Sequence, residues 1–424
     1  MIDTEASARA ALHEHGVLIV EQGGRGGVAD YTAQLAAGLA SRGVPVTIAT
    51  ADDHLYPAVP GVRAVGVFAY VRGHSQLAQR VRRAGLGPVA NGLRLLASLP
   101  ALLALSRRHA VTHVQGWEAP SLGLTATLLL RAVSSTLVYT AHNTFERRAG
   151  RLDSARVLPA LSRQTIVHTE SDRHRVSRPP AVIPHGHYRA VAESAPVLDT
   201  DQARRALGLP TDRPIVLLFG VLRPDKGLND LLDAAAGIPA WHVLIAGEDH
   251  GGLAPAAGRL SAAALAGRVT VLEGFHPIDH VGRLFAAADL VALPYRRASQ
   301  SGVLHLAYGF ARPVAAYPVG GLTEAVIPGV TGWICREPTP DALADVLREA
   351  GAAGREELRR LGEEGRRWAE EAFDWDRIAE LTEMVYLRAL LSGAASTNER
   401  DDGPRPVAAA PPPRLPGSPR GPGG

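Results

Sequence analysis

Apolar runs of strand length alternate with amphipathic runs of helix length along most of this chain, and the alternation occurs twice. The strand-like runs of the first half are residues 16–21, 44–50, 111–116, 136–142, 164–170 and 181–186, with helices expected over 29–42 and 93–108. Those of the second half are residues 214–220, 241–248, 268–274, 288–295, 312–318 and 331–335, with a helix from Leu228. Such alternation is typical of helix-covered parallel sheets. We therefore predict an α/β chain with two Rossmann-like, doubly wound domains that face each other across a ligand cleft.

The domain limits are expected where this alternation pauses. We predict a first domain over residues 1–190, a second over 191–375, and a C-terminal helix over 376–392 that returns to the first domain. The polar, aperiodic stretch 188–200 is interpreted as the linker between the domains. Residues 393–424 are rich in Pro and Gly and poor in apolar side chains, so a disordered tail is predicted there.

Composition excludes several function classes. Of the 424 residues, 46% are hydrophobic and 21% charged, which is a globular balance. The net charge of +3 comes without a basic stretch interleaved with aromatics, so no nucleic-acid partner is expected. Cys335 is the one cysteine, which excludes an internal disulfide and suits a reducing cytoplasm. The start lacks the pattern of a signal peptide, and the longest apolar stretch, residues 93–105, falls short of the roughly 20 residues that span a bilayer. We expect a cytoplasmic protein.

A glycine-rich segment, EQGGRGGVADY (residues 21–31), joins the first strand to the first helix. Gly24 and Gly26 begin a G-x-G-x-x-A match to the dinucleotide-binding fingerprint, and the acidic residues 52–53 lie where a ribose-binding acid is expected. Asp30 argues against this interpretation, because it places a negative charge where a pyrophosphate would dock. A nicotinamide site and a purely structural turn therefore both stay open.

A basic turn follows the first strand of the second half. In LFGVLRPDKGLNDLL (residues 218–232), Arg223 and Lys226 lie between a strand and a helix N-terminus, where they could clamp a diphosphate. A solvated basic turn is the alternative. Lys226 is, however, the sole lysine among 45 basic Lys and Arg residues, in a chain that uses arginine everywhere else. This favours contact with phosphate.

At these residues the chain resembles a known family. GVLRPDKGLNDLLDA, VLIAGE, VTVLEGFHPIDHVGRLFAAADLVALPY, ARPVAAYPVGGLTEAV, GVTGWIC and FDWDRIAE are similar to the donor-binding half of retaining GT-B glycosyltransferases of glycosyltransferase family four. TAHNTFE and VIPHGHY resemble the first half of that family. The resemblance runs from about Gly16 to Tyr386 and is weaker between Asp52 and Leu105. It implies a GT-B fold and transfer of a sugar from a nucleotide-diphosphate sugar to an acceptor, with retention at the anomeric carbon.

The resemblance also implies roles for individual residues. Arg223 and Lys226 match the pair that neutralises the leaving diphosphate without a metal or other cofactor, and His142 matches a catalytic histidine near the transferred sugar. The donor-binding residues would be Gly220, Arg223, Lys226, Gly274, Phe275, His276, Ser301, Gly302, Val303 and Glu324. The glycine loop would line the acceptor side of the cleft through Gly24, Gly26, Gly27 and Asp30, and Asn143 beside His142 would line the same side. Alternatively, His142 could be a structural residue whose hydrogen bonds are satisfied by neighbouring backbone. Glu324 could likewise be an acid that caps a helix.

One departure concerns a pair of glutamates that the family commonly carries seven residues apart. In an ungapped match through ARPV these positions are Ala298 and Leu306, and a QSGV loop offers amides and a hydroxyl instead. Two rivals follow: a GT-B sugar-nucleotide epimerase, which would need such carboxylates, and a non-catalytic glycosyltransferase-like protein. A nicotinamide dehydrogenase is the third alternative.

The acceptor is not specified by the sequence, and lipid-linked and polysaccharide acceptors both stay open. Arginines surround the apolar stretch 93–105 at positions 72, 80, 82, 83, 94, 107 and 108. Such an edge could hold the protein at the inner membrane face by anionic attraction and shallow insertion. The alternative is a core helix with a solvated basic edge.

Overall fold

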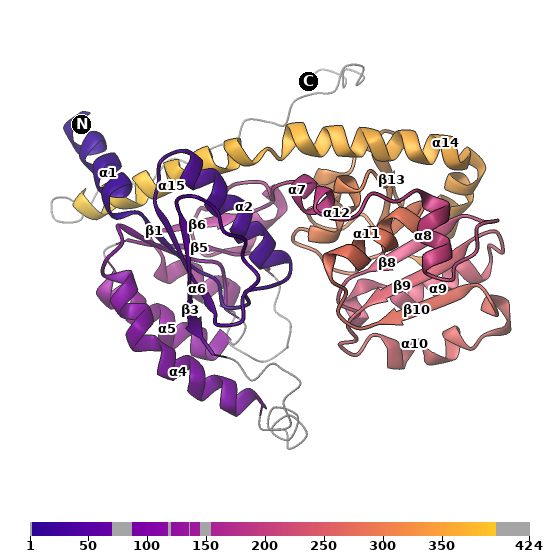
Figure 1. Ribbon diagram of the computed structural model, residues 1–424, viewed down its shortest axis with the longest axis horizontal. Coiled ribbons are helices and arrows are strands. Elements are labelled where there is room, and N and C mark those ends of the chain that lie inside the picture. Colours follow the sequence, from indigo (N-terminus) through magenta and orange to yellow (C-terminus); the bar gives the residue numbers. More distant parts are fainter. Residues whose placement is uncertain (1, 70–86, 118–119, 135, 145–153, 396–424) are drawn as a thin grey trace. The chain divides into compact units, whose positions relative to one another are not determined.

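A computed structural model describes residues 2–69, 87–117, 120–134, 136–144 and 154–395, and shows two compact α/β units (Figure 1). The first unit contains the described residues up to Gly186, residues 298–300 and the C-terminal helix from Trp375. The second contains His187–Arg297 and Ser301–Asp374. Each unit is built on its own parallel sheet, so the predicted α/β class with two parallel sheets is confirmed.

The sheet of the first unit has the order β3-β2-β1-β4-β5-β6-β7, and all of its neighbouring strands are parallel. Its strands are β1 (Val17–Val20), β2 (Val46–Ala51), β3 (Val62–Phe68), β4 (Val111–Val114), β5 (Leu137–Thr140), β6 (Gln164–Val167) and β7 (Ala181–Val182). Successive residues of a strand point to opposite faces, and alternate residues of β1 accordingly belong to two different cores. This explains why the central strands are continuous apolar runs.

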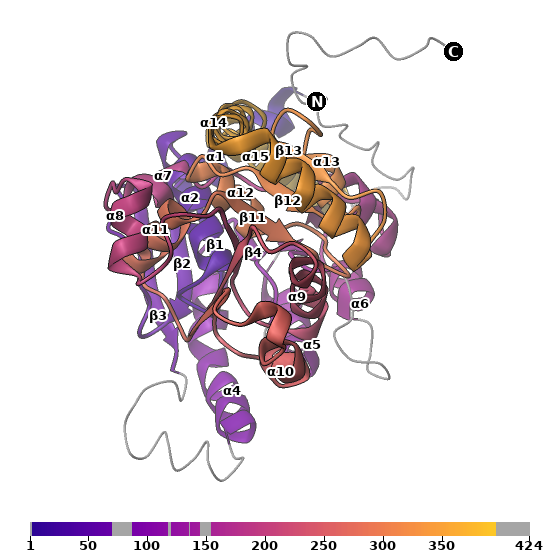
Figure 2. The ribbon, with the colours of Figure 1, turned by 90° about the vertical axis from the view of Figure 1, so that its right-hand side faces the viewer.

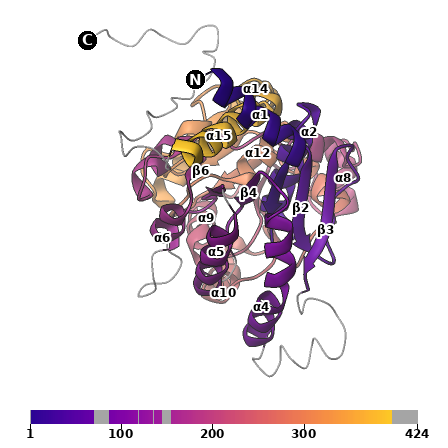
Figure 3. The ribbon, with the colours of Figure 1, turned by 90° about the vertical axis from the view of Figure 1, so that its left-hand side faces the viewer.

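Helices cover both faces of this sheet (Figure 3). The helices of the unit are α1 (Ile2–His15), α2 (Gly27–Ser41), α4 (Gly87–Ser106), α5 (Pro120–Val133), α6 (Ser154–Leu161) and α15 (Trp375–Ala395), with the 3-10 turn η1 (Glu170–Arg175). The core that includes Val17 and Ile19 is closed by α1, α2 and α15, whereas Leu18 and Val20 pack with residues of α4, α5 and α6.

Buried polar contacts fix α15 on the first unit. The carboxylate of Glu383, which is 3% exposed, accepts hydrogen bonds from Arg9 of α1 and Arg42 after α2, both at 2.8 Å. The Tyr386 hydroxyl lies 2.7 Å from His113 Nδ1 in β4. A Cβ at Gly38 would lie 2.9 Å from the Ala379 side chain, so α2 and α15 pack closely at a small residue. The last described helix is therefore an integral part of the first unit.

The sheet of the second unit has the order β10-β9-β8-β11-β12-β13, also parallel. Its strands are β8 (Ile215–Phe219), β9 (His242–Gly247), β10 (Val269–Glu273), β11 (Leu290–Leu293), β12 (Val314–Ala316) and β13 (Gly332–Ile334). Its helices are α7 (Arg189–Glu193), α8 (Thr200–Ala206), α9 (Leu228–Ala236), α10 (Leu253–Leu260), α11 (Ile278–Ala287), α12 (Gly302–Gly309), α13 (Leu322–Ala325) and α14 (Pro340–Ala372), with turns η2 (Pro224–Lys226) and η3 (Ala263–Leu265). Helices α9 and α10 lie on one side of the sheet, and α8 and α11 on the other (Figure 2).

Several sequence expectations are corrected by this structure. Helix α2 begins at Gly27, two residues before the expected start, because Gly26 adopts φ 82° and serves as its N-cap. The supposed linker 188–200 contains α7, and Tyr188 at its start is buried against α12. Strand β3 was not predicted, because it is an edge strand with a half-exposed pattern that lacks a continuous apolar run.

The C-terminal helix ends later than the sequence analysis expected. Helix α15 extends to Ala395, past the expected start of the tail at residue 393, and residues 396–424 lie outside the described residues. No helix within the described ranges has the length and apolarity required to cross a bilayer.

Candidate functional site

The strand order of the second unit reverses between β8 and β11, and open parallel sheets bind ligands beyond the carboxyl ends of the strands at such a point. The loop after β8 carries Arg223 and Lys226, and the loop after β11 carries Tyr295. The Lys226 Nζ lies 3.5 Å from the centroid of the buried Tyr295 ring. This cation–π contact joins the two loops at the switch point.

Arg223 is held by a carboxylate that the sequence interpretation did not consider. Its Nε and one terminal nitrogen donate to the two Asp225 oxygens at 2.9 and 3.0 Å, a bidentate pair. The hydrogen bonds raise the pKa of the Arg223 guanidinium and lower the pKa of the Asp225 carboxyl. Both side chains are partly exposed, so a bound phosphate could replace the carboxylate on the guanidinium fork.

Glycine is sterically required at two places around this pair. Gly227 adopts φ 72°, and a Cβ there would lie 1.9 Å from the Pro294 carbonyl oxygen. A Cβ at Gly247, the last residue of β9, would lie 1.7 Å from the Gly220 carbonyl oxygen. Backbone therefore packs directly on backbone beside the clamp. Gly227 directly precedes a predicted helix, so its position in the sequence could indicate a turn that needs glycine. Nothing local in the sequence indicated the contact between Gly247 and Gly220.

The other predicted donor residues also lie at this carboxyl edge. Gly274 follows β10 with φ 127°, and its N–H donates to the Gly247 oxygen at 3.0 Å. Phe275 is 57% exposed. His276 packs beside Phe219, and its Nε2 lies 3.0 Å from the Leu272 oxygen.

The loop after β11 ends in the first turn of α12. The Ser301 side chain caps this helix by accepting the Leu304 N–H at 3.3 Å. Gly302 and Val303 follow in the first turn, where backbone N–H groups point out of the helix. Ala298 and Leu306, where an ungapped match leads one to expect the glutamate pair, are both buried. Glu324 is exposed in α13, the short helix after β12.

In the first unit, a buried glutamate that the sequence interpretation missed organises the glycine loop. The Glu21 carboxylate accepts the N–H groups of Gly23 and Gly24 at 2.6 and 2.7 Å. It also accepts the hydroxyls of Thr50 at 3.2 Å and Tyr56 at 2.8 Å. Glu21 thus ties the loop after β1 to the loop after β2.

This arrangement weakens the dinucleotide interpretation. Two loop amides already point at a carboxylate, and Asp53, an expected ribose ligand, forms an ion pair with Arg25 of the loop. A Cβ at Gly24 would lie 2.8 Å from the His54 side chain, so this glycine is required for packing.

Burial, and secondarily the nearby Glu21 charge, raises the pKa of Asp30 to about 6.

The remaining loop positions are open. A Cβ at Gly26 would have no neighbour within 4 Å, although its φ of 82° favours glycine. Gly27 is exposed at the start of α2, and Asn143 is exposed two residues beyond Ala141 on the segment after β5. At Gly26 a ligand could approach the backbone without displacing protein atoms.

His142 lies among other rings at the carboxyl edge of the first sheet. Its Nδ1 is 3.0 Å from His168 Nε2, and its Nε2 is 2.7 Å from the Gln115 side-chain amide. The ring of Tyr31 in α2 contacts it edge-on, with centroids 4.9 Å apart. Burial, followed by the neighbouring His168, lowers the pKa of His142 well below its usual value. The sequence interpretation placed His142 but missed Gln115 and treated His168 as an ordinary strand residue.

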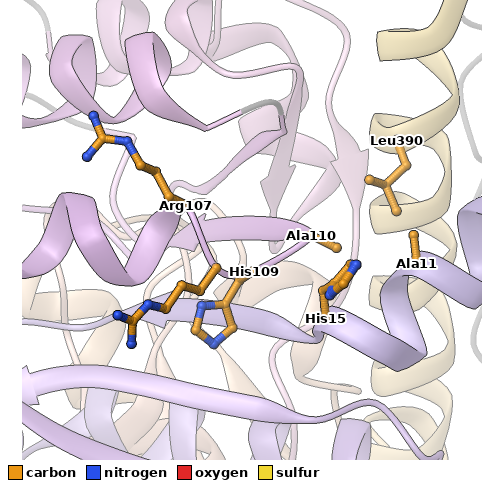
Figure 4. A pocket seen from close by; sticks show the side chains of 7 residues that line it. Ala11, His15, Arg107, His109, Ala110 and Leu390 are labelled. Atoms are coloured by element: carbon orange, nitrogen blue, oxygen red, sulfur yellow. The ribbon is translucent and has the colours of Figure 1, made fainter.

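A further pocket of about 500 Å³ lies at the opposite, amino-terminal edge of the first sheet (Figure 4). Its lining residues are Ala11, His15, Arg107, Arg108, His109, Ala110 and Leu390. Both arginines follow the end of α4, and His15 ends α1, so these side chains complement the negative ends of two helix dipoles.

Within the described ranges, no group of three or more His, Cys, Asp or Glu side chains is arranged to hold a metal ion.

Two family models match the chain, one in each half. Residues 199–368 match the model described as Glycosyl transferases group 1, and residues 26–176 match the model described as Glycosyl transferase 4-like domain.

Similar proteins match either most of the chain or a part of it. A D-inositol 3-phosphate glycosyltransferase of Mycobacterium avium (strain 104) is 30% identical over 418 residues, which cover 90% of this chain and 93% of the relative. A protein of the same name from Mycolicibacterium gilvum (strain PYR-GCK) is 40% identical over 162 residues, which cover 37% of this chain and 36% of the relative.

Solved structures share the fold at lower identity. Sucrose-phosphate synthase from Thermosynechococcus elongatus aligns with a TM-score of 0.69 at 20% identity, over 89% of this chain and 100% of that one. Anabaena HepE in complex with UDP and glucose aligns with a TM-score of 0.67 at 20% identity, over 87% and 98% of the two chains. The catalytic domain of starch synthase IV from Arabidopsis thaliana, bound to ADP and acarbose, aligns with a TM-score of 0.68 at 15% identity. The alignment covers 89% of this chain and 99% of that one.

Proposed function

The chain belongs to the group 1 family of glycosyl transferases and has the GT-B fold, and on that premise we propose that it transfers a sugar from a nucleotide-diphosphate sugar to an acceptor hydroxyl with retention of configuration. The observation that carries the proposal is the pair Arg223 and Lys226 at the strand-order reversal of the second unit. A diphosphate is the donor group that two such cations suit best.

In the proposed step, the acceptor hydroxyl oxygen forms a bond to the anomeric carbon as the bond from that carbon to the diphosphate oxygen breaks. The new bond forms on the face from which the diphosphate departs, and the hydroxyl proton passes to an oxygen of the leaving phosphate. Negative charge builds on the diphosphate during this step. Arg223 and Lys226 stabilise that charge, so we propose a reaction independent of metal ions.

Binding of the donor would use the other groups at the same edge. Arg223 exchanges Asp225 for phosphate oxygens, and the amides of Gly302 and Val303 face phosphate at the N-terminus of α12. Phe275 and the backbone beside Gly274 contact the nucleobase. The exposed Glu324 accepts hydrogen bonds from sugar hydroxyls.

The rival functions each lack a feature of this site. An epimerase would need carboxylates to move protons at the sugar, and Ala298 and Leu306 supply none at the positions of the family pair. The retained clamp argues against a non-catalytic protein. A nicotinamide dehydrogenase would need loop amides that Glu21 already occupies.

The first test is a thermal-shift screen of the purified chain with UDP-, GDP-, ADP- and dTDP-sugars. One of these donors should raise the melting temperature, and the product formed from it should keep the donor's anomeric configuration by proton NMR, with EDTA present. The name of the Mycobacterium avium relative makes D-inositol 3-phosphate the first acceptor to assay. Absence of a shift with every donor would contradict the proposal, as would an inverted product.

We also propose peripheral contact with an anionic membrane surface through α4 and α5. Neither helix contains an acidic residue, and each exposes leucines: Leu93 (64%) and Leu96 (43%) on α4, Leu128 (48%) and Leu129 (38%) on α5. Arg94 and Arg131 supply positive charge on these helices. Apolar side chains beside arginines suit shallow insertion among anionic headgroups.

Co-sedimentation with vesicles of anionic or of neutral phospholipid tests this contact. The wild-type protein should sediment with anionic vesicles at low salt, and the quadruple change of these leucines to serine should abolish sedimentation. Val197→Ser is the matched control, because Val197 is 99% exposed in the second unit. Equal sedimentation of the quadruple variant and the wild type would exclude α4 and α5 as the contact.

A further inference from the structure

Four polar groups form one row along the carboxyl edge of the first sheet. The Gln115 Oε1 lies 2.7 Å from His142 Nε2, His142 Nδ1 lies 3.0 Å from His168 Nε2, and His168 Nδ1 lies 3.0 Å from the Ile183 oxygen. These groups follow β4, β5, β6 and β7 in turn. Each hydrogen bond in the row restricts the proton positions of the next one.

The backbone carbonyl at one end sets the direction of the row. The Ile183 oxygen can only accept, so His168 Nδ1 must carry a proton. Burial lowers the pKa of His168 to about 4 and the pKa of His142 well below its usual value, so both rings are neutral at pH 7. A neutral ring has one N–H, so His168 Nε2 accepts from His142 Nδ1. His142 Nε2 is then an acceptor as well.

An acceptor at His142 Nε2 requires a donor from Gln115. The structure places the Gln115 oxygen at this nitrogen, where two lone pairs would meet at 2.7 Å, and the amide nitrogen is then buried without a partner among the described residues. Rotation of the amide by 180° removes the conflict at His142. Gln115 is only 3% exposed, so its amide lies inside the protein beside the ring.

We infer that Gln115 is a positioning residue that donates its amide N–H to His142 Nε2 and so holds His142 as the neutral Nδ1–H tautomer. Tyr31 packs edge-on against both His142 and His168, with ring centroids 4.9 and 5.0 Å away, and limits rotation of the two rings. The other titratable rings around them are His113 in β4 and His185 after β7.

A consequence follows for the transfer reaction, and it rests on the proposed function. Both nitrogens of His142 are committed within the protein, one as donor to His168 and the other as acceptor from Gln115. His142 therefore does not take the proton of the acceptor hydroxyl, and this proton goes to the leaving phosphate. The tautomer itself does not depend on what the protein transfers.

Nitrogen NMR of the full-length protein tests the tautomer without any substrate. In deuterated, ¹⁵N-labelled protein at pH 7, His142 should show a protonated Nδ1 and an unprotonated Nε2, with its signals assigned by their loss in His142→Asn. A scalar coupling across the hydrogen bond should connect the Gln115 amide nitrogen with His142 Nε2. A protonated Nε2 on His142 would overturn the inference, as would a doubly protonated ring on either histidine.

A variant pair separates positioning from general loss of structure. Gln115→Met should lose the nitrogen–nitrogen coupling and shift the His142 Nε2 resonance, because methionine donates no hydrogen bond. Gln164→Met, at the amino-terminal end of β6, should leave both signals unchanged. If Gln115→Met left the His142 Nε2 resonance in place, Gln115 would have no positioning role. If the Met variant failed to fold, the wild-type coupling would still decide the question.

Discussion

The two units have the same kind of sheet but opposite chemistry at its carboxyl edge. The edge of the second unit carries the cations Arg223 and Lys226 on loops that close backbone contacts fix in place. The edge of the first unit carries the carboxylates Glu21 and Asp30 and the neutral histidine row. One edge is thus cationic, whereas the other combines carboxylates with neutral imidazole rings.

The comparison also separates two uses of glycine. In the second unit Gly227 and Gly247 allow backbone to touch backbone, so their absent side chains serve the fold around the clamp. In the first unit Gly26 faces open space, so its absent side chain leaves room for a ligand. Glycines in loops at equivalent strand ends can therefore serve either close packing or access for a ligand.

The largest expected effect is on catalysis at the cationic edge. Lys226→Ala and Arg223→Ala should each lower kcat about 10²–10³-fold, because charge on the departing diphosphate loses a preorganised partner. Steady-state kinetics with the donor found in the screen measures this loss. Arg213→Ala is the control, since Arg213 precedes β8 at the opposite edge and pairs with the exposed Asp212. A near-normal kcat in both variants would show that the positive charge of the second unit's edge does not contribute to catalysis.

The second prediction compares glycines. Gly227→Ala should destabilise the second unit by about 3 kcal/mol, because it adds a clash with the Pro294 carbonyl to an unfavourable φ. Gly26→Ala should cost the first unit less, about 2 kcal/mol, because its φ of 82° and ψ of −174° favour glycine but no protein atom would clash with the new Cβ. Hydrogen exchange of each unit measures the two costs. Equal costs would refute the distinction between packing and open glycines.

The third prediction uses pH to examine the acidic edge. Asp30 binds its proton more tightly when folded, since its pKa rises from 3.8 to about 6. Its stabilising contribution is complete below pH 3.8 and is lost as the pH rises through 6. Asp30→Asn should therefore stabilise the first unit by about 1–2 kcal/mol at pH 7 relative to its effect at pH 3.5.

Urea unfolding of wild-type and Asp30→Asn protein at both pH values measures this difference. Asp201→Asn is a control, because Asp201 is an exposed aspartate in α8 of the second unit. A variant that is less stable than the wild type at pH 7 would show that the Asp30 charge is stabilised in the folded protein.

The smallest effect is expected at the surface of the glycine loop. Arg25→Ala should change stability by less than about 1 kcal/mol, because the pair with Asp53 is 38% and 43% exposed. Thermal melting at low and at high salt checks this, and the two conditions should agree within that range. A loss of several kcal/mol would show that this ion pair, rather than Glu21, organises the loop.

Sequence patterns predicted the parts of the molecule that depend on local periodicity. The buried central strands are apolar on both faces, so they stand out as continuous runs. Arg223, Lys226 and His142 were found because each follows such a run directly or in the next turn. Edge strand β3 was missed because its exposed face breaks the apolar pattern.

Contacts between distant residues could not be predicted in this way. Glu21 receives the hydroxyl of Tyr56, 35 residues away, and no local pattern connects the two. The stacking of Lys226 on Tyr295 and the row from Gln115 to Ile183 each need neighbouring strands in their final order. The sequence therefore indicated the candidate site residues more readily than the residues that hold them.

Helix α15 has a consequence for how the protein is made. The core between the first sheet, α1 and α2 includes Trp375 and Tyr386 of α15. Arg9 and Arg42 form their ion pairs with Glu383 of the same helix. The ribosome supplies these residues only after the whole second unit has been synthesised. Domains of a nascent chain generally fold in order of emergence, but here the unit that emerges first must wait for the last helix. Its apolar surface is exposed throughout that interval, so chaperone binding during translation should concentrate on the first unit.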